Sequence, residues 1–171
     1  MKHWSRRTLL IVVLLAALLV VPASRCLWRH TGVYPQMGPP SQAQPVQIEG
    51  IDFAVEQPHY VLGRGYAMRW ALSKRTERSY ALLPQQGHCE VWLERQIEGQ
   101  WYTLVQQLEP DVFPQEPTVL DRNVTGFEAS FTQKYQGYGT RLEPGHYRLA
   151  LCLRDEQTGQ EQVIAESFWI D

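Results

Sequence analysis

The stretch that decides the fold is Phe127–Leu153, which reads FEASFTQKYQGYGTRLEPGHYRLALCL. Apolar and polar residues alternate over Phe127–Thr132 and again over Tyr147–Leu153. Alternation with a period of two predicts strands that bury one face. The tripeptide Glu143-Pro144-Gly145 predicts a type II turn, with Gly145 at positive φ, that leads into the second strand. We expect Tyr147 to enter the core and Arg148 to point outward, where its replacement would be nearly neutral.

Five further strands surround this stretch, and turn signals separate them. Glu98-Gly99 predicts a hairpin between two of them. Seven short antiparallel strands predict an all-β immunoglobulin-like sandwich, with a small barrel as the alternative, behind one N-terminal hydrophobic helix. The five segments are Ile48–Val55, Tyr66–Leu72, Glu90–Glu94, Trp101–Val105 and Val163–Ile170.

The N-terminal segment Thr8–Ala23, TLLIVVLLAALLVVPA, is uncharged and apolar, and Lys2, Arg6 and Arg7 precede it. Residues 1–30 carry five basic and no acidic side chains, whereas the rest of the chain is acidic. This asymmetry predicts a signal-anchor over residues 1–30, with the basic end in the cytoplasm and the body outside it. A cleaved secretory signal remains the alternative. The near-neutral net charge of -2 gives no reason to expect a nucleic-acid partner.

Residues 31–45, TGVYPQMGPPSQAQP, contain four prolines, two glycines and no charge. Such a composition buries too little apolar surface to offset chain entropy. It predicts a solvated linker that ends where the globular domain, residues 46–171, begins.

Two motifs resemble a known family. LERQIEGQWYTL (Leu93–Leu104) and FEASFTQKYQGYGTRLEPGHYRLAL (Phe127–Leu151) are similar to the bacterial Ig-like domain of Gram-positive surface proteins. The resemblance covers residues 46–171 and implies an accessory or interaction module with a β-sandwich fold. A related family, the intracellular proteinase inhibitors, shares the layout. The matching positions are Tyr138, Gly139, Leu142, Pro144, Gly145, Tyr147 and Arg148.

Reactive residues form no catalytic pattern. No histidine or cysteine pair stands at metal-ligand spacing, no serine lies in a nucleophile elbow, and no glycine-rich loop precedes a helix. We therefore predict no enzyme activity, no metal and no cofactor. An oxidising exterior favours a disulfide between Cys89 and Cys152, but the two residues differ in face parity, so two separate thiols are the alternative.

The predicted surface offers a candidate binding face. Trp92 has the opposite parity to its buried neighbours and is expected to point outward as an aromatic anchor, beside solvated Glu94. Trp101, in contrast, is expected to be structural. The loop Tyr135–Gly139 carries two tyrosines, and we favour packing of Tyr138 onto the core over a binding role. The full candidate set is Trp92, Tyr135, Tyr138, Arg69 and Arg75.

These observations predict a membrane-tethered, extracytoplasmic, non-enzymatic module for recognition, adhesion or an envelope accessory role. Its partners would be the membrane and another envelope protein or a protease. The alternative is an extracytoplasmic peptidase inhibitor that presents a loop such as Asp111–Thr125.

Overall fold

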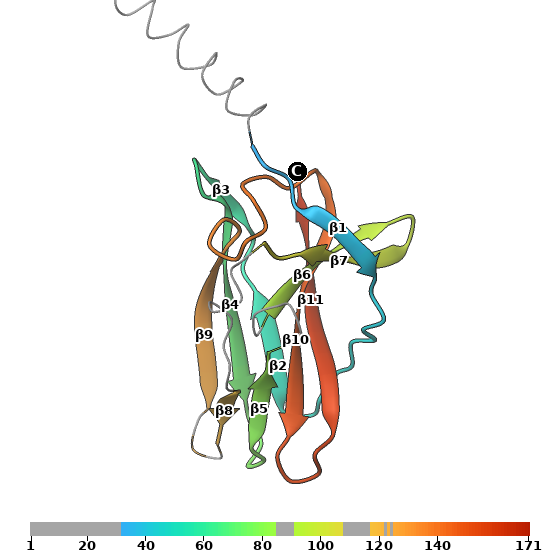
Figure 1. Cartoon of the computed structure of the whole chain (residues 1–171). Coiled ribbons are helices and arrows are strands. Elements are labelled where there is room, and N and C mark those ends of the chain that lie inside the picture. The colour runs from blue at the N-terminus through green and yellow to red at the C-terminus, as the bar shows by residue number, and fades with distance from the viewer. Residues whose placement is uncertain (1–31, 85–90, 108–116, 122, 124) are drawn as a thin grey trace, which may run out of the picture. The chain divides into compact units, whose positions relative to one another are not determined.

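The computed structural model describes residues 32–84, 91–107, 117–121, 123 and 125–171. The chain divides into two compact units, and the second, Tyr34–Asp171, holds the strands described below (Figure 1). The described residues form eleven strands and no helix. The strands are β1 (Gln36–Pro40), β2 (Ile51–Val55), β3 (His59–Val61), β4 (Gly65–Lys74), β5 (Tyr80–Leu83), β6 (Val91–Ile97), β7 (Gln100–Val105), β8 (Thr118–Leu120), β9 (Gly126–Thr132), β10 (Gly145–Asp155) and β11 (Glu161–Ile170).

The larger sheet is antiparallel and is built around β10, with the order β1-β7-β6-β10-β5-β8 and β11 on the other edge of β10. Leu83 of β5 pairs with Cys152, and Val91 of β6 pairs with the adjacent Leu151. Strands β5 and β6 therefore follow one another along the same edge of β10, although residues 84–90 separate them in the sequence. Strands β6 and β7 form the predicted hairpin, with φ of 50° at Glu98 and 83° at Gly99, as a type I′ turn requires.

The smaller sheet is also antiparallel and is built around β4. Strands β2 and β3 both pair with one edge of β4, and β9 pairs with the other edge. Pro58 stands between β2 and β3, where it interrupts the backbone hydrogen bonding because proline has no N–H to donate.

One hydrophobic core joins the two sheets. Alternate residues of β4 and β9 meet alternate residues of β6 and β10, as the period of two predicts. The largest fully buried side chains of this core are Tyr138, Tyr147, Phe131, Met68, Leu72, Leu82, Leu93, Leu104, Leu120, Leu149, Leu151 and Leu153. The all-β, antiparallel class predicted from the alternation is confirmed.

All seven predicted strands are present, and the four additional ones are β1, β3, β5 and β8. Strand β1 corrects the predicted linker. Gln36–Pro40 pairs with β7 through Gln36–Val105 and Met37–Leu104, so this proline-rich segment adds an edge strand. Proline is tolerated there because an edge strand needs only half of its backbone groups for the ladder. The compact unit accordingly begins at Tyr34 rather than at Val46.

No helix in the described residues is long and apolar enough to cross a bilayer. The predicted N-terminal helix, with its membrane segment Thr8–Ala23, lies outside the described residues.

Candidate functional site: the outer face of the larger sheet

One face of the larger sheet contributes to the shared core. The opposite face, which we call the outer face, also carries packed side chains. The register places Arg148 opposite Glu94, and Ala150 opposite Trp92. On the other side of β10, His146 faces Trp169. Residues that pair across neighbouring strands share a face, so these side chains lie together on the outer face. One half of this face is covered by chain, and the other half carries a row of three aromatic rings, of which Trp169 is exposed and the other two are half-buried.

The covered half is a small apolar cluster. Its buried members lie on β5, β6 and β10, and residues from β11 and from the segment before β2 pack against them. Because of this burial, the pKa of the Cys152 thiol is raised above its ordinary value. The cluster consists of Ala81, Leu83, Trp92, Ala150 and Cys152, with Ala43, Val163 and Ala165 packed against it.

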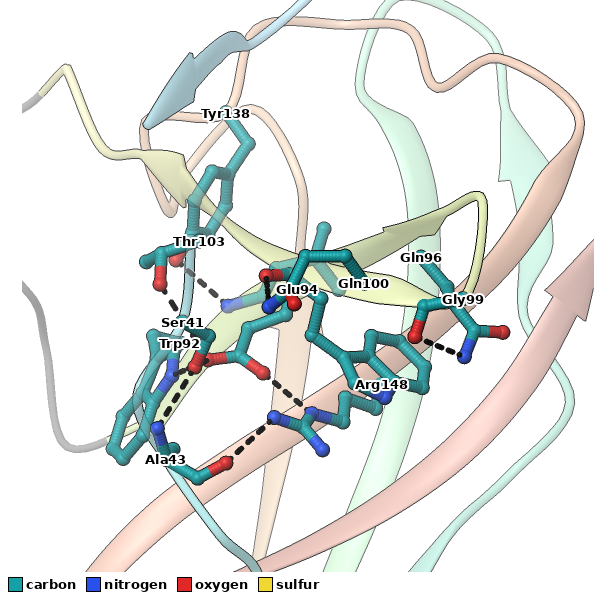
Figure 2. Close-up of polar contacts among 12 residues, drawn as sticks. Ser41, Ala43, Trp92, Glu94, Gln96, Gly99, Gln100, Thr103, Tyr138 and Arg148 are labelled. Atoms are coloured by element: carbon teal, nitrogen blue, oxygen red, sulfur yellow. Dashed lines mark hydrogen bonds and ion pairs between the residues drawn. The ribbon is translucent and has the colours of Figure 1, made fainter. Parts of the chain in front are cut away.

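Glu94 is the polar centre of the outer face, and its residue is 0% exposed. Its carboxylate accepts hydrogen bonds from Ser41 Oγ at 2.6 Å and from Trp92 Nε1 at 2.9 Å, and it pairs with Arg148 Nε (Figure 2). Burying a carboxylate is costly unless it is paired and hydrogen-bonded. These three donors come from three separate parts of the chain, and together they meet that requirement.

Arg148 lies between Glu94 and the covering segment. Its guanidinium donates to the carbonyl oxygen of Ala43 at 3.2 Å and lies 4.4 Å from the ring centroid of Trp101. Figure 2 shows Ser41 and Arg148 bound to Glu94, and Ala43 bound to both Ser41 and Arg148. Farther along, the amide of Val46 donates to the carbonyl oxygen of Val163 at 2.8 Å. Residues 41–46 are therefore fixed to the outer face, and we call them the strap.

The other half carries a row of three rings from β7, β10 and β11, which we call the aromatic row. The Trp101 and His146 ring centroids are 5.1 Å apart, and those of His146 and Trp169 are 4.7 Å apart with an interplanar angle of 9°. Gln96 Oε1 lies 2.9 Å from His146 Nδ1 and fixes the plane of the imidazole. Trp169 is 61% exposed, whereas Trp101 is half-buried on Arg148.

Three residues predicted to lie on the surface are buried. Trp92 is 5% exposed and packs beneath the strap, so the prediction that it is an outward anchor is wrong. The prediction that Trp92 points away from the main core is correct, but the outer face on which it lies is covered by the chain. The same covering buries Glu94 and Arg148, both of which were expected to be solvated.

Tyr138 is buried as well, as the favoured packing interpretation predicted. It is 0% exposed, and its hydroxyl accepts a hydrogen bond from the amide of Leu93 at 3.0 Å. It is therefore not part of a binding surface. Gln133, also buried, holds the backbone around it by donating to the carbonyl oxygens of Tyr138 and Arg141.

The other three candidates are exposed but do not form one site. Tyr135 lies in the loop between β9 and β10, under the guanidinium of Arg64. Arg75 follows β4 and pairs with Asp52. Arg69 lines a hollow of about 460 Å³ on the outer face of the smaller sheet.

Cys89 lies outside the described residues, and so does the proposed pairing of Cys89 with Cys152. Most of the candidate inhibitory loop Asp111–Thr125 lies outside them too. Among the residues that the structure describes, no three His, Cys, Asp or Glu side chains are grouped as a metal site would need.

Glu94, Arg148 and the aromatic row are the features that sequence reasoning missed. One signal was available: Glu94 and Arg148 both oppose the core parity of their strands. Their pairing needed the register of β6 against β10, which the sequence does not give.

Comparisons with known proteins add no function. No family model matches the chain, and no curated protein matches it. A solved structure, "X-ray structure of Northeast Structural Genomics Consortium target SoR45", is 10% identical, with a TM-score of 0.42. The match covers 72% of this chain and 88% of that one. A likeness at this level supports no argument about the site.

Proposed function

We propose that this chain is a membrane-tethered, extracytoplasmic, non-enzymatic recognition module, and that the aromatic row is its binding face. The proposal combines the basic, apolar N-terminal segment with an aromatic surface on a β domain. The partner would be another envelope protein.

The fold within this proposal is an immunoglobulin-like sandwich. Two antiparallel sheets that share one core support it, as does the resemblance carried by Leu93–Leu104 and Phe127–Leu151. In such domains the face of a sheet or the loops at one end present the binding residues.

The observation that carries the proposal is the exposure of Trp169. A tryptophan 61% exposed buries little of its apolar ring, so the folded domain gains little from it. Tryptophan and arginine are enriched among the residues that dominate binding energy at protein interfaces. Stacking on His146, which Gln96 and Trp101 hold in place, restricts the rotamers of Trp169 before binding. Less side-chain entropy is then lost when a partner binds.

Photo-crosslinking in intact cells tests this binding face. A photoreactive amino acid in place of Ser167, which is exposed on the same face, should give one discrete protein adduct. The same amino acid at Glu128, on the smaller sheet, should not give that adduct. Trp169→Ala should abolish the Ser167 adduct, whereas the matched control Val119→Ala, exposed on β8, should keep it. An adduct that survives Trp169→Ala would show that the aromatic row is not the binding face.

Protease added to intact cells tests the topology. It should degrade the domain and leave the N-terminal segment with the membrane fraction. A domain protected until the cells are lysed would contradict an extracytoplasmic location.

A further inference from the structure

A second exposed surface lies at one end of the domain, which we call the tip. It comprises Tyr34, the segment Tyr60–Arg64 and the loop Lys134–Arg141 (Figure 1). The segment Tyr60–Arg64 contains the end of β3 and the turn that leads to β4. The amide of Lys134 donates to the carbonyl oxygen of Arg64 at 3.1 Å. Arg141 Nη1 donates to the hydroxyl of Tyr34 at 3.1 Å. These contacts join three separate parts of the chain into one surface.

The tip exposes large apolar side chains. Leu62 is 66% exposed, Tyr135 60%, Tyr34 47% and Tyr60 45%. Single exposed hydrophobic residues are ordinary, but several gathered at one end of a domain mark an interaction surface.

Side-chain hydrogen bonds from Gln133 and Gln106 fix the backbone of the loop that carries Tyr135. Buried Gln133 accepts a hydrogen bond from the amide of Tyr66 and donates two to the loop backbone. Gln106 Nε2 also donates to the carbonyl oxygen of Gln136 at 3.1 Å. Tyr135 is thus presented outward by a fixed loop while Tyr138, three residues on, is buried.

The charge of the tip is basic. Its three segments contain Arg64, Lys134 and Arg141 and no acidic residue. Glu143, which pairs with Arg95, and the C-terminal Asp171 lie close to the same end, so the net excess is small. The exposed apolar side chains of the tip should therefore contribute more to an interaction than its charges do.

We propose that the tip lies against the headgroup region of the bilayer that tethers the chain. This inference rests on the proposed membrane anchor. Residues 24–33 connect the apolar segment to Tyr34, and even fully extended they reach only about 35 Å. Tyrosine is enriched where protein meets the lipid headgroups, leucine inserts its side chain among the upper acyl chains, and arginine and lysine pair with anionic headgroups. The tip combines these residue types.

Lipid quenching of a fluorescent amino acid tests the inference on the full chain. The protein is reconstituted in phosphatidylcholine–phosphatidylglycerol vesicles that contain nitroxide-labelled lipid, with the probe at Leu62 or, as a control, at Val119. Val119 is also exposed, but it lies on β8 at the other end (Figure 1). We expect quenching at Leu62 to exceed that at Val119 by about twofold or more, and to weaken in pure phosphatidylcholine because the anionic attraction is lost.

Hydrogen exchange of the unsubstituted chain provides a second measurement. Exchange within Tyr60–Arg64 and Lys134–Arg141 should be slower in the vesicles than in detergent, while exchange in β8 should not change. If the chain stays in the vesicles after an alkaline wash but Leu62 is no more quenched than Val119, the tip inference is wrong and the anchor stands. If the wash removes the chain, both the anchor and the tip inference are wrong. Protection of the tip that appears only with a partner protein present would assign the tip to that protein and overturn the lipid contact.

Discussion

Arg148 of β10 and Glu94 of β6 form an ion pair inside the protein, with side chains 9% and 0% exposed. The two residues face each other in the register of the sheet, on the side away from the main core. Ser41 and Ala43 cover the pair and bond to it. The pair therefore connects the centre of the larger sheet to a segment that composition alone places in a solvated linker.

Breaking this pair should destabilise the domain strongly. Arg148→Met leaves Glu94 buried without its cation and should cost about 3–5 kcal/mol, the range for one partner removed from a buried ion pair. Urea unfolding measures the loss. The double variant Glu94→Leu/Arg148→Met should cost less than the sum of the single variants, because no charge is left uncompensated. Additive costs would show that the two charges do not interact.

Ser41→Ala should loosen the strap. The variant removes a hydrogen bond to a buried carboxylate and should cost about 1.5–3 kcal/mol, the range for bonds to charged groups. Amide exchange at Ala43 and Val46 should become faster, because both residues lie in the strap. The matched control is Ser167→Ala, which is exposed and should change neither stability nor exchange. A strap that exchanges no faster in Ser41→Ala would mean that other contacts hold it.

Replacing Trp92 should cost more stability than replacing Trp101, which is the opposite of what the sequence alone predicts. Trp92 is buried and donates to Glu94, whereas Trp101 is half-buried on Arg148 and His146. Trp92→Ala should cost about 3–5 kcal/mol through lost burial and a cavity. Trp101→Ala should cost less. Thermal unfolding of the two variants provides the comparison. A larger loss of stability in Trp101→Ala would contradict the packing of the strap over Trp92.

Gly65 and Gly63 form a matched pair for testing the loop support. Both adopt positive φ, at 78° and 75°. A Cβ at Gly65 would lie 2.5 Å from Oε1 of buried Gln133, whereas a Cβ at Gly63 meets nothing within 4 Å. Both alanine variants carry the backbone strain, about 1–2 kcal/mol, so the excess loss in Gly65→Ala measures the clash with Gln133. Equal melting temperatures would show that Gln133 can move without cost.

Alkaline pH should weaken the fold through Tyr147. Burial raises the pKa of Tyr147 from 10.0 to about 12. Between these values the unfolded chain has lost the phenol proton and the folded chain still holds it, so stability falls as pH rises. Tyr147→Phe removes this proton, and its stability should fall less steeply over pH 10–12. Urea unfolding at several pH values measures both slopes, and identical slopes would assign the alkaline loss to other groups.

At Gly145 the predicted type II turn is absent: the chain bends at Pro144, and strand β10 begins at the next residue. Gly145 does adopt positive φ, at 154°, but this is close to extended backbone and far from the angle of a type II turn. Strand β10 begins at Gly145 itself, and pairing with Ile170 keeps that residue extended.

The sequence by itself determined seven of the strands, the hairpin at Glu98-Gly99 and the inward face of each of those strands. These features follow from local chemistry: an alternating strand has only two faces, and a two-residue turn of this type needs residues that accept positive φ. For this reason Tyr147 and the leucines of β10 lie in the core as expected.

Only the tertiary structure decided what covers the other face. Alternation shows which residues share a face, but it cannot show that a proline-rich segment with no periodicity packs over Trp92 and Glu94. That packing depends on contacts between residues about fifty positions apart, Ser41 with Glu94 and Glu94 with Arg148. The aromatic row and the tip were hidden for the same reason, because their members become neighbours only when separate strands and loops are brought together.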